Sequence, residues 1–302
     1  MSINQIKEFI TKSSEVLKGK EDKVELVITN LLASGHTLIE DTPGVGKTTL
    51  AKLISKGFNL DLSRIQFTND LLPSDIIGGQ IFDKNIQRFY FHKGPIFGEL
   101  ILADELNRAS PKTQSALLQV MEERKINIDG EEFILPECFN VIATQNPNSQ
   151  IGTNSLPESQ LDRFSMKIDI GHLDKESTLK MLSQGNIESS LSKFESVVTK
   201  DQLMATIQSC QKVHIEENIL EMIYKLLDFS RVDSQFLSLS NRAGLDLVKV
   251  MKAFAFIKER DYVIPDDLIY LFPFVCGHRL VIPDSSSIEL ERELSEKLIK
   301  LL

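Results

Sequence analysis

The chain has 302 residues, of which 42 % are hydrophobic, so it is long enough for one large or two ordinary domains with a real core. Its 34 Lys and Arg residues against 43 Asp and Glu residues give a net charge of -9, which argues against general affinity for nucleic acid or anionic lipid. The 3 cysteines lack disulfide or metal-ligand spacing and no apolar run has the length of a membrane span, so we expect a cytoplasmic protein without a membrane span.

The first two thirds of the chain alternate short apolar runs with helical patterns, which predicts a parallel, doubly wound sheet. The runs expected to form strands lie at 36 to 40, 64 to 67, 99 to 103, 139 to 143 and 164 to 170. Several of them are apolar throughout, as is typical of central strands covered on both faces. After about Ile170 the strand pattern ends, and helical periodicity at 219 to 227 and 247 to 257 predicts a second, all-helical domain.

Two insertions in this pattern are predicted to be β-hairpins. Residues 125 to 135 place Asp129-Gly130, a strong hairpin signal, between two β-rich runs. Residues 76 to 97 carry paired β-rich runs around Asp83-Lys84-Asn85. Both hairpins are expected to project from the sheet.

A glycine-rich segment, DTPGVGKTT at 41 to 49, follows the first predicted strand and precedes a predicted helix. Gly44 and Gly46 can take positive φ, so that backbone N–H groups at a helix N-terminus close on phosphate oxygens. Lys47 is expected to reach the β and γ phosphates, and the Thr48 hydroxyl to ligate Mg²⁺. The alternative is a glycine-rich turn without function. The predicted nucleotide-binding residues of this loop are Pro43, Gly44, Val45, Gly46, Lys47, Thr48 and Thr49.

One residue of this loop departs from the GxxxxGK[ST] pattern. Asp41 stands where the pattern has its first glycine. That glycine mainly eases the entry turn, and aspartate also occupies turn conformations. We therefore expect the loop to keep its function.

Three polar residues follow the predicted strands at 99 to 103 and 139 to 143. Asp104 and Glu105 come directly after the run 99 to 103, at the strand end where doubly wound sheets bind ligands. Asp104 can hold Mg²⁺ through water, and Glu105 can orient and activate an attacking water. Asn146 follows the run 139 to 143 and can hydrogen-bond that water or the γ phosphate. Taken alone, each is more often an ordinary turn residue, so these assignments depend on the loop upstream.

An arginine near the end of the predicted sheet is a candidate for catalysis between subunits. Arg163 lies between apolar neighbours in LPESQLDRF, residues 156 to 164. An arginine supplied across a subunit contact stabilises transition-state charge. The alternative is a surface ion pair between Asp162 and Arg163.

Taken together, these motifs resemble the MoxR family of AAA+ ATPases. RIQFTNDLLPSDI and ADELNRASPKTQSALL are long, specific blocks, and MoxR-like loops often read EDxPGxGKT, which accommodates Asp41. The resemblance covers nearly the whole chain. Further similar blocks are VLKGKEDKVE, HTLIEDTPGVGKTTLAK, FNVIATQNP, LPESQLDRF and HRLVI.

The resemblance implies roles for the candidate residues. In SLSNRAGL, Arg242 matches the lid arginine called sensor 2, although Asn241 replaces the proline usual in the family. Gly19, with Val16 and Leu17, lies where related ATPases pack around adenine. The other implied roles are Walker A for Lys47 and Thr48, Walker B for Asp104 and Glu105, sensor 1 for Asn146, and an arginine finger acting on the neighbouring subunit's nucleotide for Arg163.

The resemblance also implies a domain plan and a function. The plan is an AAA+ core over residues 1–172, with hairpin insertions near 76–97 and 125–135, a linker at 173–190 and an all-helical lid at 191–302. The implied function is Mg²⁺-dependent ATP hydrolysis by a homo-hexameric ring that remodels or matures a client protein, including metal-cofactor insertion. A partner carrying a von Willebrand factor A domain is expected.

Three other functions stay open from the residues. A nucleotide-dependent switch without sustained turnover would lack a catalytic acid or finger, so Glu105 and Arg163 argue against it. A nucleic-acid motor would want basic hairpin tips; the acidic tip at 129–132 argues against this, whereas the other insertion carries Lys84, Arg88, His92 and Lys93. A magnesium-chelatase-type subunit fits the sequence blocks less well.

Overall fold

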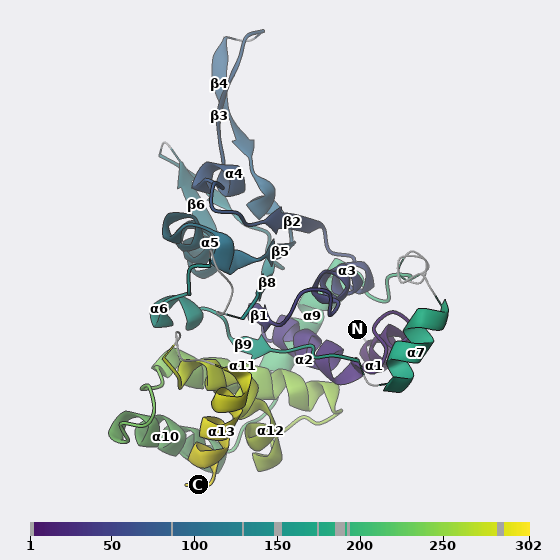
Figure 1. Cartoon of the computed structure of the whole chain (residues 1–302), viewed down its shortest axis with the longest axis vertical. Coiled ribbons are helices and arrows are strands. Elements are labelled where there is room, and N and C mark those ends of the chain that lie inside the picture. Colours follow the sequence, from purple (N-terminus) through teal and green to yellow (C-terminus); the bar gives the residue numbers. More distant parts are fainter. Residues whose placement is uncertain are drawn as a thin grey trace.

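A five-stranded parallel sheet forms the centre of the molecule, between a projecting hairpin and a bundle of helices (Figure 1). The computed structural model describes residues 3–85, 87–128, 130–147, 153–173, 175–184, 191, 194–282 and 287–302. None of the described helices combines the length and apolar character needed to span a bilayer.

The central sheet has the strand order β2-β5-β8-β1-β9, and every neighbouring pair is parallel. All five predicted strands are confirmed, at Thr37–Glu40 (β1), Leu62–Gln66 (β2), Leu100–Asp104 (β5), Asn140–Gln145 (β8) and Met166–Ile168 (β9). The chain runs from β1 out to β2, returns through β5 and β8, and then passes to β9 on the other side of β1. The carboxyl end of β1 is therefore the switch point where such sheets bind ligands.

Strand β5 is apolar from Leu100 to Ala103 because alternate side chains enter two different cores. Leu100 and Leu102 of β5 belong to one core, and Ile101 and Ala103 belong to the other. The first core also contains side chains of α1 (Ile3–Ser13), α2 (Glu21–Leu32), α3 (Lys47–Gly57) and the C-terminal helices. The second contains side chains of α4 (Pro73–Ile77), α5 (Pro111–Glu123) and α6 (Glu158–Leu161).

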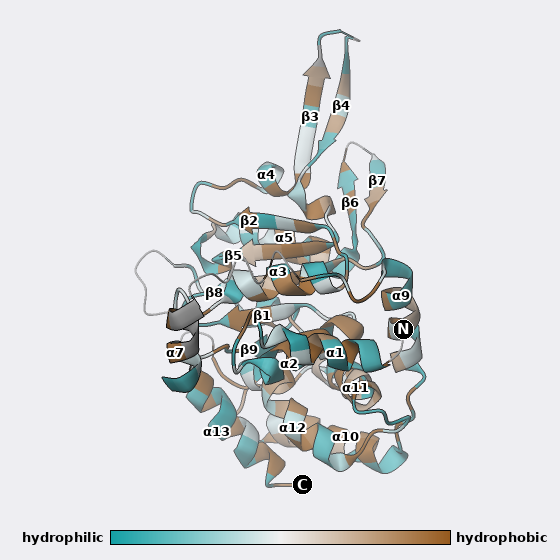
Figure 2. Cartoon of the chain, turned by 90° about the vertical axis from the view of Figure 1, so that its right-hand side faces the viewer, coloured by the Kyte–Doolittle hydropathy of each residue, from teal (hydrophilic) through white to brown (hydrophobic). Residues whose placement is uncertain are grey.

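Two antiparallel hairpins leave the sheet domain. Strands β3 (Gly78–Asp83) and β4 (Arg88–Lys93) form the longer one, which extends far beyond the body of the molecule (Figures 1 and 2). Its base is tight, because a Cβ at Gly78, where φ is 102°, would collide with the carbonyl oxygen of His92. Strands β6 (Lys125–Ile128) and β7 (Glu131–Ile134) form the shorter hairpin, whose turn residue Asp129 lies outside the described residues.

Short 3₁₀ helices and one further α-helix complete the part of the chain before the C-terminal bundle. The 3₁₀ helices are η1 (Pro95–Phe97), after the long hairpin, and η2 (Leu106–Arg108), after β5. Helix α7 (Lys175–Gln184) lies within the segment 173–190, which was expected to be a linker.

The C-terminal third of the described chain is a bundle of helices. Ser240 accepts a hydrogen bond from the backbone N–H of Ala243 and so caps the N-terminus of the longest of them. That helix packs against α2, which attaches the bundle to the sheet domain. The elements are α9 (Lys200–Gln211), α10 (Glu217–Val232), α11 (Asn241–Ile257), α12 (Pro265–Cys276), η3 (Gly277–Arg279) and α13 (Ile288–Ile299).

A buried ion network joins the sheet to the last helix. Nζ of Lys167, on β9, lies 3.1 Å from Oε2 of Glu40 on β1 and 2.6 Å from Oε1 of Glu291 on α13. The Gln145 amide on β8 donates a hydrogen bond to Glu40. Although burial alone would lower the pKa of Lys167, the carboxylates of Glu291 and Glu40 raise it, so Lys167 is charged inside the protein.

Candidate active site

A cavity of about 320 Å³ lies at the carboxyl end of β1 and brings most of the predicted site residues together. Of the seven predicted loop residues, only Val45 does not line it, because this side chain packs against the core. The cavity residues are Pro43, Gly44, Gly46, Lys47, Thr48, Thr49, Asp104, Glu105 and Asn146.

The glycine-rich loop has the backbone needed to surround an anion. Gly44 and Gly46 have φ of 88° and 103°, which disfavours residues with a Cβ. Helix α3 begins at Lys47, immediately after Gly46, and no side chain caps its N-terminus. The first backbone N–H groups of α3 are therefore donors for a phosphate at the mouth of the helix.

Lys47 is held at the cavity by three oxygen atoms. Its Nζ donates to the carbonyl oxygen of Asp41 at 2.5 Å, to Oδ1 of Asn146 at 3.1 Å and to the carbonyl oxygen of Gln145 at 3.5 Å. Burial lowers the pKa of the Lys47 ammonium, while the nearby carboxylates, led by Asp41, oppose the shift. The ammonium is thus fixed where a phosphate oxygen would meet it.

Asp41, the residue that departs from the loop pattern, has a structural role that depends on its carboxylate. Its Oδ2 accepts hydrogen bonds from the backbone N–H groups of Ile170 at 3.0 Å and Gly171 at 2.6 Å. Its Oδ1 accepts from the backbone N–H of Thr42 at 2.7 Å. The carboxylate therefore ties the entry of the loop to the chain that follows β9. The prediction of a tolerated turn residue missed this role.

Thr144 on β8 aligns the acidic pair. Its hydroxyl donates to Oδ1 of Asp104 at 2.7 Å and accepts from the backbone N–H of Glu105 at 2.9 Å. Glu105 adopts φ of 57°, a left-handed conformation that is uncommon outside glycine and typical of functional sites. The other oxygen of Asp104 accepts from NH2 of Arg64, on β2, at 2.7 Å.

The carboxylate of Glu105 accepts hydrogen bonds from two side chains and forms an ion pair with a third. Asn146 Nδ2 lies 3.2 Å from Oε1, while Gln66 Nε2 and Arg108 Nε lie 3.0 and 3.1 Å from Oε2. The sequence prediction included Asn146 but missed Arg64 and Gln66. Their spacing of two residues on β2 could have indicated that both side chains lie on one face of the strand. The sequence does not show that this face adjoins the acidic pair, because that depends on the pairing of Gln66 with Asp104.

The donor set at the cavity fits Mg²⁺. The Thr48 hydroxyl and the Asp104 carboxylate are hard oxygen donors, and both line the cavity. Within the described part of the chain, no group of three or more His, Cys, Asp or Glu side chains could hold a metal ion alone. In Mg²⁺ sites of this kind, one or two protein ligands, water and substrate phosphates usually share the ion.

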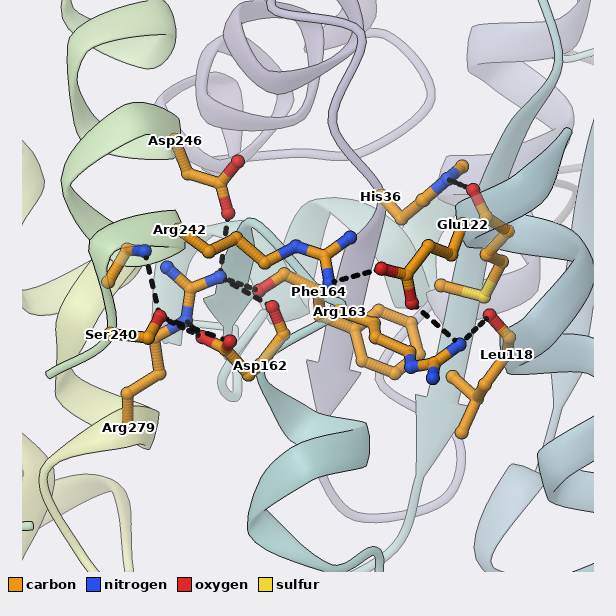
Figure 3. Close-up of polar contacts among 12 residues, drawn as sticks. His36, Leu118, Glu122, Asp162, Arg163, Phe164, Ser240, Arg242, Asp246 and Arg279 are labelled. Atoms are coloured by element: carbon orange, nitrogen blue, oxygen red, sulfur yellow. Dashed lines mark hydrogen bonds and ion pairs between the residues drawn. The ribbon is translucent and has the colours of Figure 1, made fainter.

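Arg163 and Arg242 lie together at the opposite edge of the sheet (Figure 3). Both line a second cavity, of about 300 Å³, which also includes His36 at the amino end of β1. Lys47 lies beyond the carboxyl end of this strand. A four-residue strand is about 13 Å long, so neither arginine reaches the glycine-rich loop of its own chain.

The alternative of a surface ion pair between Asp162 and Arg163 is wrong. Oδ1 of Asp162 lies 3.0 Å from Nε of Arg279 and accepts a hydrogen bond from Oγ of Ser240 at 3.0 Å. Arg163 instead contacts Glu122, with NH1 lying 3.0 Å from Oε2. Asp162 therefore links the sheet domain to the helical bundle, whereas Arg163 contacts Glu122 on α5.

The predicted adenine region lies beside the loop. Gly19 has φ of 65°, and both Val16 and Leu17 are buried. A Cβ at Gly46 would lie 3.1 Å from Cδ2 of Leu17, so this leucine packs directly on the loop. None of these three N-terminal residues lines the 320 Å³ cavity, and a role at adenine stays a prediction.

A phosphate-binding loop, a carboxylate pair at a strand end and a polar residue on the neighbouring strand are the elements of a P-loop nucleotide site. Here they stand in a parallel sheet that is followed by a helical lid. Fold and site together define a P-loop ATPase of the AAA+ class.

Comparison with known proteins gives the same class of ATPase and identifies the family within it. Residues 36–166 match the ATPase family associated with various cellular activities (AAA), and residues 234–299 match the AAA lid domain. The chain is 41 % identical over 277 residues to the uncharacterized protein YeaC of Bacillus subtilis, covering 91 % of this chain and 87 % of that protein. It is 32 % identical over 303 residues to chaperone MoxR1 of Mycobacterium tuberculosis, covering 97 % and 80 %.

A solved structure agrees over the full length. The crystal structure of a candidate ATPase from Cytophaga hutchinsonii matches this fold with a TM-score of 0.87 and 35 % identity, covering 99 % of this chain and 94 % of that one. The chain belongs to the MoxR family of AAA+ ATPases, as its motifs predicted. It is therefore a nucleotide-binding ATPase of a family that includes chaperones.

Proposed function

We propose that this chain hydrolyses Mg²⁺-bound ATP at a site shared by neighbouring subunits of a cytoplasmic ring, and that the ring remodels a client protein. The observation that carries the proposal is the separation of the candidate residues into two groups. Lys47, Asp104 and Glu105 line the cavity at the carboxyl edge of the sheet, whereas Arg163 and Arg242 line the cavity at the amino edge.

The first group binds ATP and activates water. Lys47 and the N-terminus of α3 bind the β and γ phosphates, and Thr48 and Asp104 hold Mg²⁺, which supplies neutralisation of phosphate charge when bound. Glu105 orients the attacking water, and Asn146 hydrogen-bonds the water or the γ phosphate. Because Gln66 and Arg108 bind Oε2 of Glu105 in this structure, the carboxylate must release them before it can face water.

The second group acts on the nucleotide of a neighbour. Phosphoryl transfer needs positive charge around the γ phosphate, and an arginine from a second subunit supplies it in related chemistry. Head-to-tail contacts that close into a ring give every loop one neighbouring pair of arginines, and we propose six subunits. Arg242 then acts in trans together with Arg163, and an isolated subunit is nearly inactive.

The long hairpin is the proposed surface for the client. Its strands β3 and β4 expose Ile81, Phe82, Phe89 and Tyr90, with Phe89 69 % accessible, at the far end of the molecule from the helical bundle (Figure 2). Exposed apolar side chains clustered on a projection are typical of surfaces that bind other proteins. Chaperone MoxR1 is among the relatives, which favours a client protein. From the family resemblance we further propose that the ring matures its client, including by metal-cofactor insertion, with a partner carrying a von Willebrand factor A domain.

Steady-state ATP hydrolysis measured against protein concentration, with light scattering on the same samples, tests the shared site. We expect specific activity to rise with concentration as the ring forms, because each site needs its neighbour. Full activity of a species with the mass of one chain would overturn the proposal.

A further inference from the structure

One carboxylate joins the tips of the two arginines at the amino edge. Glu122 lies in the last turn of α5 and uses a different oxygen for each partner (Figure 3). Its Oε2 is 3.0 Å from NH1 of Arg163, and its Oε1 is 3.3 Å from NH1 of Arg242. NH1 of Arg163 also donates to the carbonyl oxygen of Leu118 at 2.6 Å.

A buried hub fixes the backbone beneath both arginines. Arg279, whose side chain is 4 % exposed, donates to the carbonyl oxygens of Asp162 at 2.9 Å and Phe164 at 3.1 Å, the residues on either side of Arg163. The carboxylate of Asp162 accepts from Ser240, the residue that caps α11 just before Arg242. The bases of the two arginines are therefore tied to one another, although 79 positions separate them in sequence.

Two guanidinium groups that converge repel each other, and a carboxylate between them offsets the repulsion. Glu122 contacts NH1 of each group, and each planar guanidinium carries five N–H donors in all. Arg124 and Lys249 line the same cavity and add positive charge. The arrangement suits an anion that contacts the guanidinium groups of Arg163 and Arg242 at the same time.

We propose that Glu122 is a positioning residue, which holds Arg163 and Arg242 as a pair that meets the γ phosphate of a neighbouring subunit's nucleotide. The proposal rests on the shared site described above. It assigns Glu122 to the subunit that donates the arginines, so a change at Glu122 acts on the neighbour's turnover.

The variant Glu122→Gln removes the charge and keeps the shape of a side chain that is 45 % exposed, so folding is not at risk. We expect kcat to fall about fivefold with little change in KM for ATP, because exposed ion pairs are individually weak and the ATP-binding loop is untouched. Glu122→Asp should restore part of the loss. The matched control is Glu123→Gln, one residue on, where the carboxylate accepts from Gln119 and contacts neither arginine in an ion pair, and here kcat should not change.

Mixed rings separate positioning from a general structural effect. Subunits with Glu105→Gln keep their arginines, and subunits with Arg163→Ala keep their loop, so mixing the two should recover activity at hybrid interfaces. Adding Glu122→Gln to the Glu105→Gln subunit should reduce that recovery about fivefold, whereas adding it to the Arg163→Ala subunit should not.

The outcomes also distinguish the two proposals. If the parent mixture forms rings but recovers no activity, the shared site itself is wrong. If the parent mixture recovers and Glu122→Gln has the same effect in either subunit, or none, the role of Glu122 is overturned.

Discussion

The two edges of the central sheet differ in the candidate residues that they carry. The carboxyl edge carries Asp41, Asp104 and Glu105 around Lys47, and each carboxylate is held by hydrogen bonds within its own domain. The amino edge carries Arg163 and Arg242, which come from distant parts of the chain and meet at Glu122. A phosphate needs cations, and these two arginines stand at the edge that lacks the loop.

In the proposed shared site, a subunit with a preformed loop needs its neighbour because the carboxyl edge binds ATP and the arginines of the amino edge complete the charge around it. Strand β1 joins the two, since His36 precedes it and Asp41 follows it. The predictions below test each edge, beginning with the largest effect.

Loss of the donated arginine should be the most damaging change. We expect Arg163→Ala to lower kcat about 10³-fold or more while ATP binding stays intact, because an arginine finger contributes mainly in the transition state. Steady-state hydrolysis and equilibrium binding of a fluorescent ATP analogue measure the two quantities. Wild-type turnover by this variant would remove the functional contrast between the edges.

At the loop edge, Glu105→Gln should lower kcat about 10² to 10⁴-fold without weakening ATP binding, since water activation is lost and the phosphate contacts remain. Single-turnover hydrolysis under saturating ATP gives the rate of the chemical step. A variant with unchanged turnover would show that another group activates the water.

Asp41→Gly restores the residue that the loop pattern prescribes, and we expect it to destabilise the protein. It removes the charged acceptor for the backbone N–H groups of Ile170 and Gly171, which should lower the free energy of unfolding by about 2 kcal/mol or more. Asp41→Asn keeps one acceptor oxygen and should lose less. Urea unfolding compares the two variants with the wild type. A glycine variant as stable as the wild type would contradict a stabilising role for the hydrogen bonds to Asp41.

At the amino edge, His36 should make stability depend on pH. Burial lowers its pKa to about 3, with the charge of Arg124 acting in the same direction, and its Nδ1 accepts from the backbone N–H of Val141, as only the neutral ring can. The unfolded chain binds a proton below about pH 6.5, whereas the folded chain does not. The free energy of unfolding should therefore fall by up to about 1.4 kcal/mol per pH unit from pH 6.5 downward.

Urea unfolding of the wild type and of His36→Asn between about pH 7 and pH 5 measures this effect. In the variant, the pH dependence of the free energy of unfolding should be smaller by the contribution of one proton. It keeps His278, whose pKa is also lowered by burial, so some slope should remain. Identical slopes in the two proteins would mean that His36 is not held neutral.

The sequence predicted the loop edge better than the amino edge, for a physical reason. Lys47, Thr48, Asp104 and Asn146 follow individual strands, so local patterns suffice to place them at one end of a parallel sheet. The contacts that Gln66 makes depend on which strand lies beside β5, and that is settled by the packing of the whole domain.

The two arginines show the same limit. Their identities could be predicted from LPESQLDRF and SLSNRAGL, but no local pattern specifies the edge of the sheet at which they meet. That position depends on how the helical bundle docks through Asp162, Ser240 and Arg279. The role of Asp41 was missed for a related reason, since the backbone N–H groups that donate to it lie 129 and 130 positions away.

The buried network around Lys167 has a mechanical consequence. Pulling α13 away from β9 would break the buried contact between Lys167 and Glu291 and leave Glu40 as the partner of Lys167, which is costly for charges inside a protein. We therefore expect the sheet and α13 to turn as one rigid lever. Strain from hydrolysis would then move whole subunits against each other, and the largest displacement would fall at the tip of the long hairpin, which lies farthest from the bundle (Figure 1).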